Sequence, residues 1–255
     1  MARRAAAAPG RAGGPGGEGR PVSGEVRAYG HWGRPVLAFP AEDGRAGDWE
    51  AHGLVDAVRP LLDAGRCKLY CVDSDDGASW SDRSVPTEER ARRHDGYEGW
   101  LLGHVLPGID ADCGGPQEVV AVGVSLGAFH AVNLALRHAD RVPLAIGLSG
   151  NYEPSTWHGW GERGFAAFVH DPSAYVPQLH GDHLRWLQER LSVLLVVGEG
   201  AFEVHPTRAL PSTRHLAHLL ADRGIRCELD VWGPDTPHDW PSWARQLAHH
   251  LPRFC

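Results

Sequence analysis

Short apolar runs alternate with stretches of helical periodicity along this chain, and their order predicts the fold class. The predicted strands cover residues 25–30, 35–40, 67–72, 119–124, 144–148, 191–197 and 227–231. The predicted helices cover residues 49–64, 88–106, 126–138, 211–223 and 240–251. Because strands and helices alternate, we expect an α/β fold with a mostly parallel central sheet and helices on both faces. Ligands of such sheets bind beyond the carboxyl ends of the strands.

The predicted helix at residues 49–64 has a clear inward-facing stripe and a clear end. Its apolar positions recur at helical spacing and are Leu54, Val55, Val58, Leu61 and Leu62. Gly65 follows as the expected cap, because glycine readily adopts the left-handed conformation that ends many helices. Gly224 is expected to cap the helix at residues 211–223 in the same way.

The strongest chemical signal lies where the strand at residues 119–124 meets the following helix. The chain there reads Gly123-Val124-Ser125-Leu126-Gly127, between a valine-rich run and a helical pattern rich in alanine and leucine. A G-x-S-x-G sequence in this context is typical of the nucleophile elbow of α/β-hydrolases, in which a serine occupies a sharp, strained turn. The turn crowds the positions two before and two after the serine, so both must be small. The pattern predicts Ser125 as a nucleophile and the Leu126 amide as an oxyanion donor.

A serine nucleophile needs a base and an acid, which follow it in this fold in the order serine, acid, histidine. The base is expected in the loop after the last strand, where His238 lies in a turn-rich stretch that opens a helix. Asp235 and Asp239 flank it, but sequence neighbours rarely have the geometry to orient an imidazole. Asp239 is instead a candidate cap of the final helix. Other histidines fall within helical patterns, namely His215, His218, His249 and His250.

The acid is expected in the loop after the strand at residues 191–197, which contains Glu199 and Glu203. Glu199 comes only two residues after the strand and is placed to point back to the sheet edge. Glu203 is further out, where its carboxylate can reach across to the loop that holds His238, so Glu203 is preferred. The second oxyanion donor is expected after the strand at residues 35–40, and the nearest amides are those of Ala41 and Glu42.

Composition narrows the function classes. The chain has 255 residues, enough for one large α/β domain, and a formal net charge of −7. That charge offers no basic footprint for nucleic acid, so no nucleic-acid partner is expected. Apolar runs stay well below the ~20 residues needed to cross a bilayer, so no membrane partner is expected either. Five cysteines without metal-type spacing predict reduced thiols in a cytoplasmic protein.

Two segments depart from the alternating pattern. Residues 1–23 are alanine, glycine, proline and arginine without periodicity, which predicts a disordered low-complexity tail before a domain at residues 24–255. Residues 152–190 have poor periodicity and are predicted to be an irregular excursion over the active-site edge. Its large aromatic side chains are expected either to wall the substrate pocket or to pack the excursion onto the body: Trp157, Trp160, Phe165, Phe168 and Trp186.

The same excursion contains a histidine-rich stretch. The spacing of His180, Asp182 and His183, with His170 nearby, suits a metal ion, but the stretch is loop-like and lacks an assigned third ligand. A polar surface loop is the favoured interpretation. No metal and no cofactor are expected.

At these motifs the chain resembles the esterase D-like branch of the α/β-hydrolases, which also holds the mycolyltransferase-type esterases. The matching pieces are residues 35–40, 68–74 and 148–152, the elbow around Ser125, and the string His238-Asp239-Trp240-Pro241-Ser242-Trp243. The last is the most specific, because family members carry such a histidine-aspartate-tryptophan run at the triad base.

The resemblance implies a serine hydrolase with Ser125 as nucleophile and His238 as base. The chain departs from the family pattern at two places. Many relatives have an aspartate near the position of Ala201, where this chain has none, so the acid falls to Glu203. Relatives also often have an asparagine before a proline in the middle excursion, where this chain has Asp171 before Pro172.

Together these features predict a serine esterase that hydrolyses a small-molecule carboxylic ester through an acyl-enzyme on Ser125. Two alternatives use the same fold. An acyltransferase would pass the acyl group to an alcohol instead of water, and an inactive α/β-hydrolase fold would serve as a binding protein. The oligomeric state is not predicted.

Overall fold

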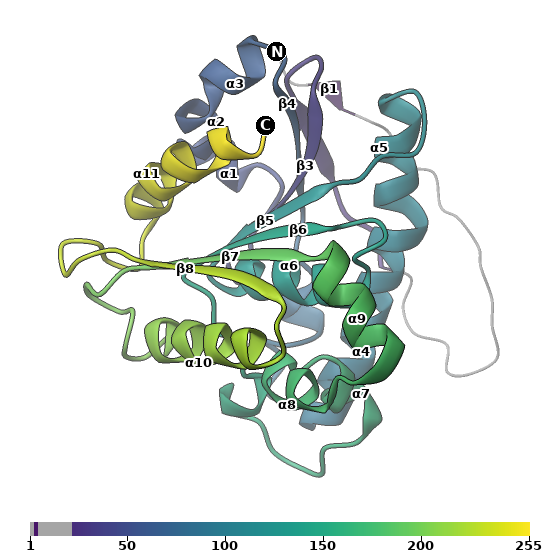
Figure 1. The fold of residues 1–255 in the computed structure, drawn as a ribbon, viewed down its shortest axis with the longest axis vertical. Coiled ribbons are helices and arrows are strands. Elements are labelled where there is room, and N and C mark those ends of the chain that lie inside the picture. The colour runs from purple at the N-terminus through teal and green to yellow at the C-terminus, as the bar shows by residue number, and fades with distance from the viewer. Residues whose placement is uncertain (1–2, 5–21) are drawn as a thin grey trace.

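The structure is a computed structural model that describes residues 3–4 and 22–255. Within these residues the chain forms one eight-stranded sheet in the order β1-β2-β4-β3-β5-β6-β7-β8 (Figure 1). The strands are β1 (Arg3–Arg4), β2 (Val26–Tyr29), β3 (Arg34–Phe39), β4 (Cys67–Val72), β5 (Val120–Val124), β6 (Leu144–Leu148), β7 (Ser192–Val197) and β8 (Arg226–Val231). The pairs β1–β2 and β2–β4 are antiparallel, and all other neighbours are parallel. The predicted α/β fold with a mostly parallel sheet is confirmed.

Helices cover both faces of the sheet, and each face has its own hydrophobic cluster. One face packs against α1 (Asp48–Ala51), α2 (Leu54–Ala57), α3 (Arg59–Asp63) and α11 (Trp240–His250) (Figure 1). The other packs against α4 (Thr87–Trp100), α5 (Leu106–Asp112), α6 (Leu126–Arg137), α7 (Phe165–Val169), α9 (Gly181–Arg190) and α10 (Ala209–Asp222). The short α8 (Pro172–Tyr175) lies between α7 and α9 in the chain.

The central strands read as continuous apolar runs because both of their faces are buried. In β5, Val120, Val122 and Val124 join the cluster under α11, whereas Ala121 joins the cluster under α6. All four side chains are fully buried. The burial of β5 on both faces therefore fixes the position of its last residue, Val124, at the carboxyl edge of the sheet.

The single helix predicted at residues 49–64 is wrong, because the segment forms the three short helices α1, α2 and α3. Gly53 separates the first two with a left-handed φ of 82°. Pro60 lies in the first turn of α3, where its missing N–H costs no helical hydrogen bond. The predicted inward stripe is nevertheless buried at all five positions: Leu54, Val55, Val58, Leu61 and Leu62.

The helix predicted at residues 88–106 continues further than its pattern indicates. After α4 the chain makes a π-helical turn at Leu101–Val105 and goes on as α5 to Asp112. The wide turn ends two residues before Pro107, which has no N–H for an ordinary helical hydrogen bond. The π turn lets the chain pass the proline without ending the helix.

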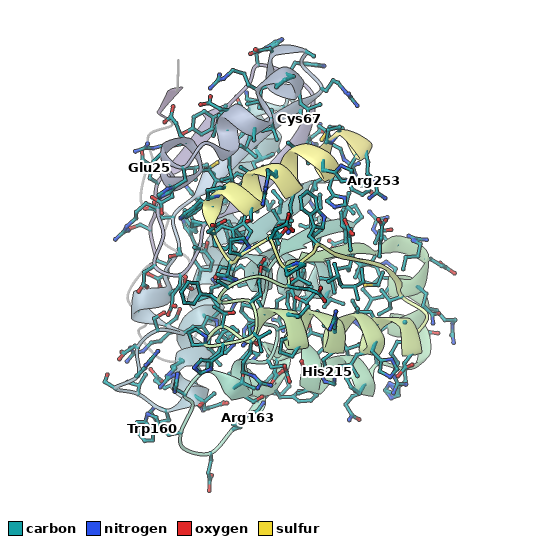
Figure 2. All side chains as sticks on the ribbon, turned by 90° about the vertical axis from the view of Figure 1, so that its left-hand side faces the viewer. Glu25, Cys67, Trp160, Arg163, His215 and Arg253 are labelled. Carbon is teal, nitrogen blue, oxygen red and sulfur yellow. The ribbon has the colours of Figure 1, made fainter. Side chains whose placement is uncertain are left out.

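The segment at residues 152–190 is more regular than its sequence pattern indicates, because it contains α7, α8 and α9. Helix α9 is easily missed in the sequence, since Leu187 is its only residue that is fully buried. Trp160 and Arg163, from the irregular part before α7, lie at the end of the molecule opposite Cys67 and Arg253 (Figure 2). The predicted division into domains stays a prediction.

The predicted disordered tail at residues 1–23 lies mostly outside the described residues; within it, Arg3–Arg4 pair with β2. Among the described residues, no helix combines the length and apolar character that crossing a bilayer requires. All five cysteines are free thiols.

The cap of α11 provides a test of the fold. The Asp239 carboxylate accepts a hydrogen bond from the Ser242 amide at 2.9 Å, as the sequence predicts for the start of this helix. Asp239→Ala removes that acceptor and is expected to lower the free energy of unfolding by about 1 kcal/mol in chemical denaturation. The control Asp235→Ala changes an exposed carboxylate of the same loop, and an equal loss in both variants would contradict the capping role.

Candidate active site

The turn between β5 and α6 holds Ser125 in a strained backbone conformation, and backbone atoms pack closely around this turn. The φ of Ser125 is 56° and its ψ is −122°, a region that residues with a side chain rarely adopt. A Cβ on Gly123 would lie 1.9 Å from the Gly127 carbonyl oxygen, and a Cβ on Gly127 would lie 2.1 Å from that of Pro40. Because these neighbours are backbone atoms, neither glycine can be replaced without moving the turn.

Ser125, His238 and Glu203 form one continuous chain of hydrogen bonds. The Ser125 Oγ lies 2.9 Å from the His238 Nε2, and the His238 Nδ1 lies 3.1 Å from the Glu203 Oε2. Glu203 is fully buried, and the His238 side chain is only 9% exposed. The imidazole therefore contacts a hydroxyl on one side and a carboxylate on the other, within a largely water-free environment.

The Glu203 carboxylate is fixed by two further donors. Its Oε1 accepts hydrogen bonds from the Ser149 hydroxyl at 2.6 Å and from the Gly198 amide at 3.3 Å. Ser149 directly follows β6 and has a left-handed φ of 55°. Ser149 has no predicted role from the sequence, although a polar residue at the carboxyl end of a strand is the kind of signal that marks this edge.

The loops after β7 and β8 approach each other closely, and this brings the acid to the histidine. A Cβ on Gly198 would lie 1.9 Å from the Thr236 carbonyl oxygen, so only glycine fits there. The His238 amide donates to the Ala201 carbonyl at 2.9 Å. Glu199, the other candidate acid, instead accepts a hydrogen bond from Arg214 at 2.7 Å and contacts α10.

A cavity of ≈ 240 Å³ opens above Ser125 and His238 at the carboxyl edge of the sheet. Trp80 and Trp157 supply its large aromatic side chains. Of the five aromatic residues proposed from the sequence as pocket walls, Trp157 alone lines it. Trp160, Phe165 and Phe168 are exposed, and Trp186 packs against the core. Trp80 comes from the loop after β4, whose sequence has no periodicity that would have marked it.

The predicted oxyanion donors lie on two elements that meet at this cavity. Leu126 and Glu42 line it, whereas Ala41 is absent from the lining among the described residues. The loop of Glu42 is held by the buried Asp76, whose Oδ2 accepts a hydrogen bond from the Asp43 amide at 3.2 Å. The Asp76 Oδ1 lies 2.8 Å from the Nε2 of His130, a buried residue of α6. Asp76 therefore joins the loop after β3 to the helix that follows Ser125.

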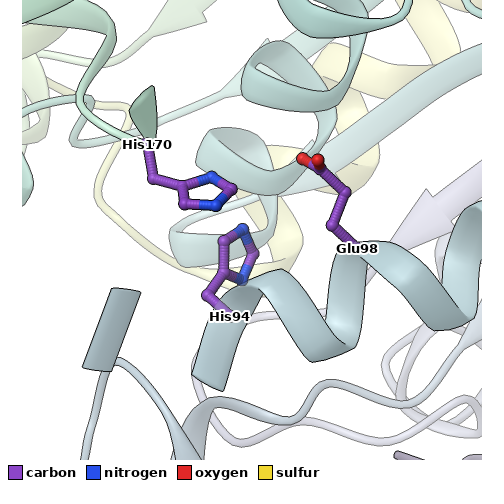
Figure 3. A group of neighbouring side chains, drawn as sticks. All are labelled: His94, Glu98 and His170. Atoms are coloured by element: carbon purple, nitrogen blue, oxygen red, sulfur yellow. The ribbon is translucent and has the colours of Figure 1, made fainter. Parts of the chain in front are cut away.

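A second cluster of polar side chains is buried behind α6. His94, Glu98 and His170 bring their nitrogen and oxygen atoms within 4.8 Å of one another, a spacing that would suit a metal ion (Figure 3). Glu98, however, is held by Arg137 and His138, which outweigh the effect of its burial and lower its pKa to about 2.

His170 already contacts Asn133 at 3.1 Å and Asp95 at 2.7 Å. Burial, with the nearby charges, lowers the pKa of His94 well below its usual value and keeps it neutral. The contacts of Glu98 and His170 form a structural hydrogen-bond network, whereas the buried Nδ1 of His94 has no hydrogen-bond partner among the described residues. The stretch considered as a metal site in the sequence is not assembled, since His180, Asp182 and His183 are exposed while His170 is buried.

Comparison with known proteins places the chain in a family. The Esterase family model matches residues 71–254, which is most of the chain and includes Ser125, Glu203 and His238. The chain belongs to this esterase family. The resemblance noted from the sequence is therefore confirmed, and membership supports hydrolysis of small-molecule esters. No curated protein matches this chain in a sequence search.

Solved structures with the same fold cover most of this chain. A ferulic acid esterase has a TM-score of 0.68 at 15% identity and covers 90% of this chain and 91% of its own. The Mycobacterium tuberculosis protein MPT51 (FbpC1) has a TM-score of 0.69 at 18% identity, with the same coverage. An S-formylglutathione hydrolase from Agrobacterium tumefaciens has a TM-score of 0.66 at 13% identity and covers 90% of this chain and 87% of its own. At these identities the likeness shows the fold.

The crowded turn at Ser125 gives a direct test. Gly127→Ala places a Cβ against the Pro40 carbonyl and is expected to lower the free energy of unfolding by about 3 kcal/mol or more. Gly99→Ala is the matched control, because Gly99 is an exposed position of α4 with open space around it. That control is expected to raise stability by about 0.5–1 kcal/mol. Equal effects of the two changes in denaturant unfolding would contradict the close approach.

Proposed function

We propose that this protein is a serine esterase that forms an acyl-enzyme on Ser125. The observation that carries the proposal is the continuous hydrogen-bond chain from the Ser125 hydroxyl through His238 to Glu203, at the floor of a cavity. A serine hydroxyl is a weak nucleophile by itself, and an adjacent imidazole oriented by a carboxylate is the arrangement that activates it. Membership of the esterase family supports an ester as the substrate.

In the proposed first step the Ser125 Oγ attacks the ester carbonyl carbon while its proton moves to the His238 Nε2. The carbonyl oxygen becomes an oxyanion, which accepts hydrogen bonds from the Leu126 amide and from the amide of Ala41 or Glu42. The tetrahedral intermediate collapses, and His238 gives its proton to the leaving alkoxide. The acyl group then remains bound to Ser125 as an ester.

In the second step a water molecule takes the place of the alcohol. His238 removes a proton from this water as its oxygen attacks the acyl carbon. The tetrahedral intermediate then collapses, the bond to the Ser125 Oγ breaks, and His238 returns the proton to that oxygen as the acid leaves. Glu203 stays ionised throughout and accepts the Nδ1–H of His238, which keeps the Nε2 directed at Ser125. The hydrogen bonds from Ser149 and Gly198 to its other oxygen prevent the carboxylate from turning away.

The two alternative functions have distinct signatures. An acyltransferase would give the acylated alcohol as product when an alcohol is added, whereas an esterase gives the free acid. An inactive binding protein would not react with a fluorophosphonate probe. A cytoplasmic location and the lack of nucleic-acid and membrane partners stay predictions.

Ser125→Ala tests the nucleophile. Without the hydroxyl, turnover of p-nitrophenyl acetate is expected to fall by about 10⁶-fold, to background, and fluorophosphonate labelling is expected to disappear. Release of p-nitrophenolate followed by absorbance measures the rate, and the exposed Ser23→Ala serves as control. Unchanged turnover in Ser125→Ala would remove Ser125 from the mechanism.

The choice of acid is tested by a pair of matched changes. Glu203→Gln removes the charge that stabilises the imidazolium and is expected to lower kcat by about 10⁴-fold. Glu199→Gln removes a surface ion pair with Arg214 and is expected to change kcat by no more than about twofold. Both rates are measured on p-nitrophenyl acetate. If Glu199→Gln were the damaging change, the assignment of the acid would be reversed.

A further inference from the structure

Two arginines in the wall of the active-site cavity have no side-chain partner among the residues that the structure describes. Arg83 lies in the turn before α4, and Arg208 lies directly before α10, so the two come from opposite halves of the chain. Within the described part of the chain, neither guanidinium makes a hydrogen bond or an ion pair. Other exposed arginines are paired, for example Arg59 with Asp56 and Arg253 with Glu228.

The charge of the cavity is opposite to that of the protein as a whole. The formal net charge of the chain is −7, but the described residues that line the cavity include two arginines and a single carboxylate, that of Glu42. Glu42 already accepts a hydrogen bond from the Ser81 hydroxyl at 2.5 Å. With its histidines neutral, the lining therefore carries a formal charge of +1, which is two positive charges minus one negative.

A third guanidinium lies behind the same wall. Arg90 is buried and donates to the carbonyl of the lining residue Trp157 at 3.2 Å. Its Nη2 has no hydrogen-bond partner among the described residues. Burial lowers the pKa of Arg90, while the negative charge of Asp82 raises it and the positive charge of Arg83 lowers it. The positive charge of Arg90 offsets the negative charge of Glu203 behind His238, so the two exposed arginines are left to attract an anion into the cavity.

The backbone at Arg208 is also unusual for its residue type. Its φ of 57° and ψ of 22° are left-handed, a conformation that glycine or asparagine adopts at lower cost. Two hydrogen bonds hold the turn, from the Asn151 side chain to the Thr207 carbonyl and from the Ser212 amide to the Arg208 carbonyl. Arg208 therefore combines a strained backbone with an unpaired charge in the wall of the cavity that holds Ser125. Backbone strain of this kind is concentrated at binding and catalytic sites.

We propose that Arg83 and Arg208 bind an anionic group, a carboxylate or a phosphate, on the ester that Ser125 cleaves. This inference rests on the proposed function and narrows its substrate to anionic esters. Guanidinium forks match the oxygens of both anions and form charge-assisted hydrogen bonds to them. Trp80 and Trp157 would contact the apolar part of the same substrate.

Three acetate esters of similar size test the proposal: 4-acetoxybenzoate, 4-acetoxyphenyl phosphate and the neutral methyl 4-acetoxybenzoate. The readout is the ratio of kcat/KM for each anionic ester to kcat/KM for the neutral one, because the ratio cancels general losses of activity. In the double variant Arg83→Gln with Arg208→Gln, the ratio is expected to fall at least about tenfold. Arg83→Lys with Arg208→Lys keeps the charge without the fork and is expected to retain part of the ratio.

Arg185→Gln is the control, because it removes an exposed charge on α9 that is not part of the cavity lining. Its ratio is expected to equal that of the unchanged protein. A ratio that falls for one anion alone identifies that anion as the group recognised. An anionic-to-neutral ratio unchanged in the double glutamine variant for both anions would overturn the inference.

Binding without turnover separates this inference from the proposed function. Calorimetry measures the Kd of benzoate and of phenyl phosphate for Ser125→Ala and for the triple variant in which Arg83 and Arg208 are also changed to glutamine. The Kd of the triple variant is expected to be at least about tenfold higher. Binding that is absent, or equal with and without the arginines, overturns the inference. If none of the three esters is cleaved faster by the unchanged protein than by Ser125→Ala, the proposed function is overturned instead.

Discussion

The close contact of backbone with backbone at the Ser125 turn constrains the rest of this structure. Gly127 packs against the Pro40 carbonyl and Gly123 against the Gly127 carbonyl, at distances that leave no room for a side chain. The start of α6 is therefore pressed against the end of β3, and the loop that follows β3 must begin beside Ser125. A strained serine persists only where its surroundings over-determine it, and here the two-sided burial of β5 provides that constraint. The position of the hydroxyl thus depends on the core of the sheet.

Much of the fold follows from the sequence because the central strands have no exposed face. An apolar run that is buried on both sides gives a strong signal, and β4 and β6 begin and end where that signal predicts. The sequence predicted helix boundaries less well where a glycine or proline interrupts a stripe of apolar residues. Gly53 and Pro60 divide one apolar stripe among three helices without changing which side chains it buries. Helix α9 has too little buried surface for periodicity to reveal it.

The site was predictable to the extent that its residues are tied to strand ends. Ser125 follows β5 and His238 lies in the loop after β8, and chain order in this fold assigns each a place. The acid was harder, because Glu199 and Glu203 share one loop and the choice depends on how that loop folds. Its path is set by the approach of Gly198 to the Thr236 carbonyl, a long-range contact that no local pattern encodes. Trp80 was missed for the same reason, since it reaches the cavity from an irregular loop.

Helix α6 carries polar side chains on its buried surface, and these fix it more specifically than apolar packing would. His130 contacts Asp76, Asn133 contacts His170, and Arg137 contacts Glu98, so three directed contacts recur along one helix. Apolar packing tolerates small shifts, whereas hydrogen bonds in a low dielectric weaken steeply when their geometry changes. Burial of these groups has a cost, because the Nδ1 of His130 has no partner among the described residues. The network offsets that cost by setting the position of the start of α6. Asp76, which contacts His130, also accepts a hydrogen bond from the Asp43 amide in the loop after β3. One carboxylate thereby fixes the spacing between the two elements from which an oxyanion would receive its hydrogen bonds.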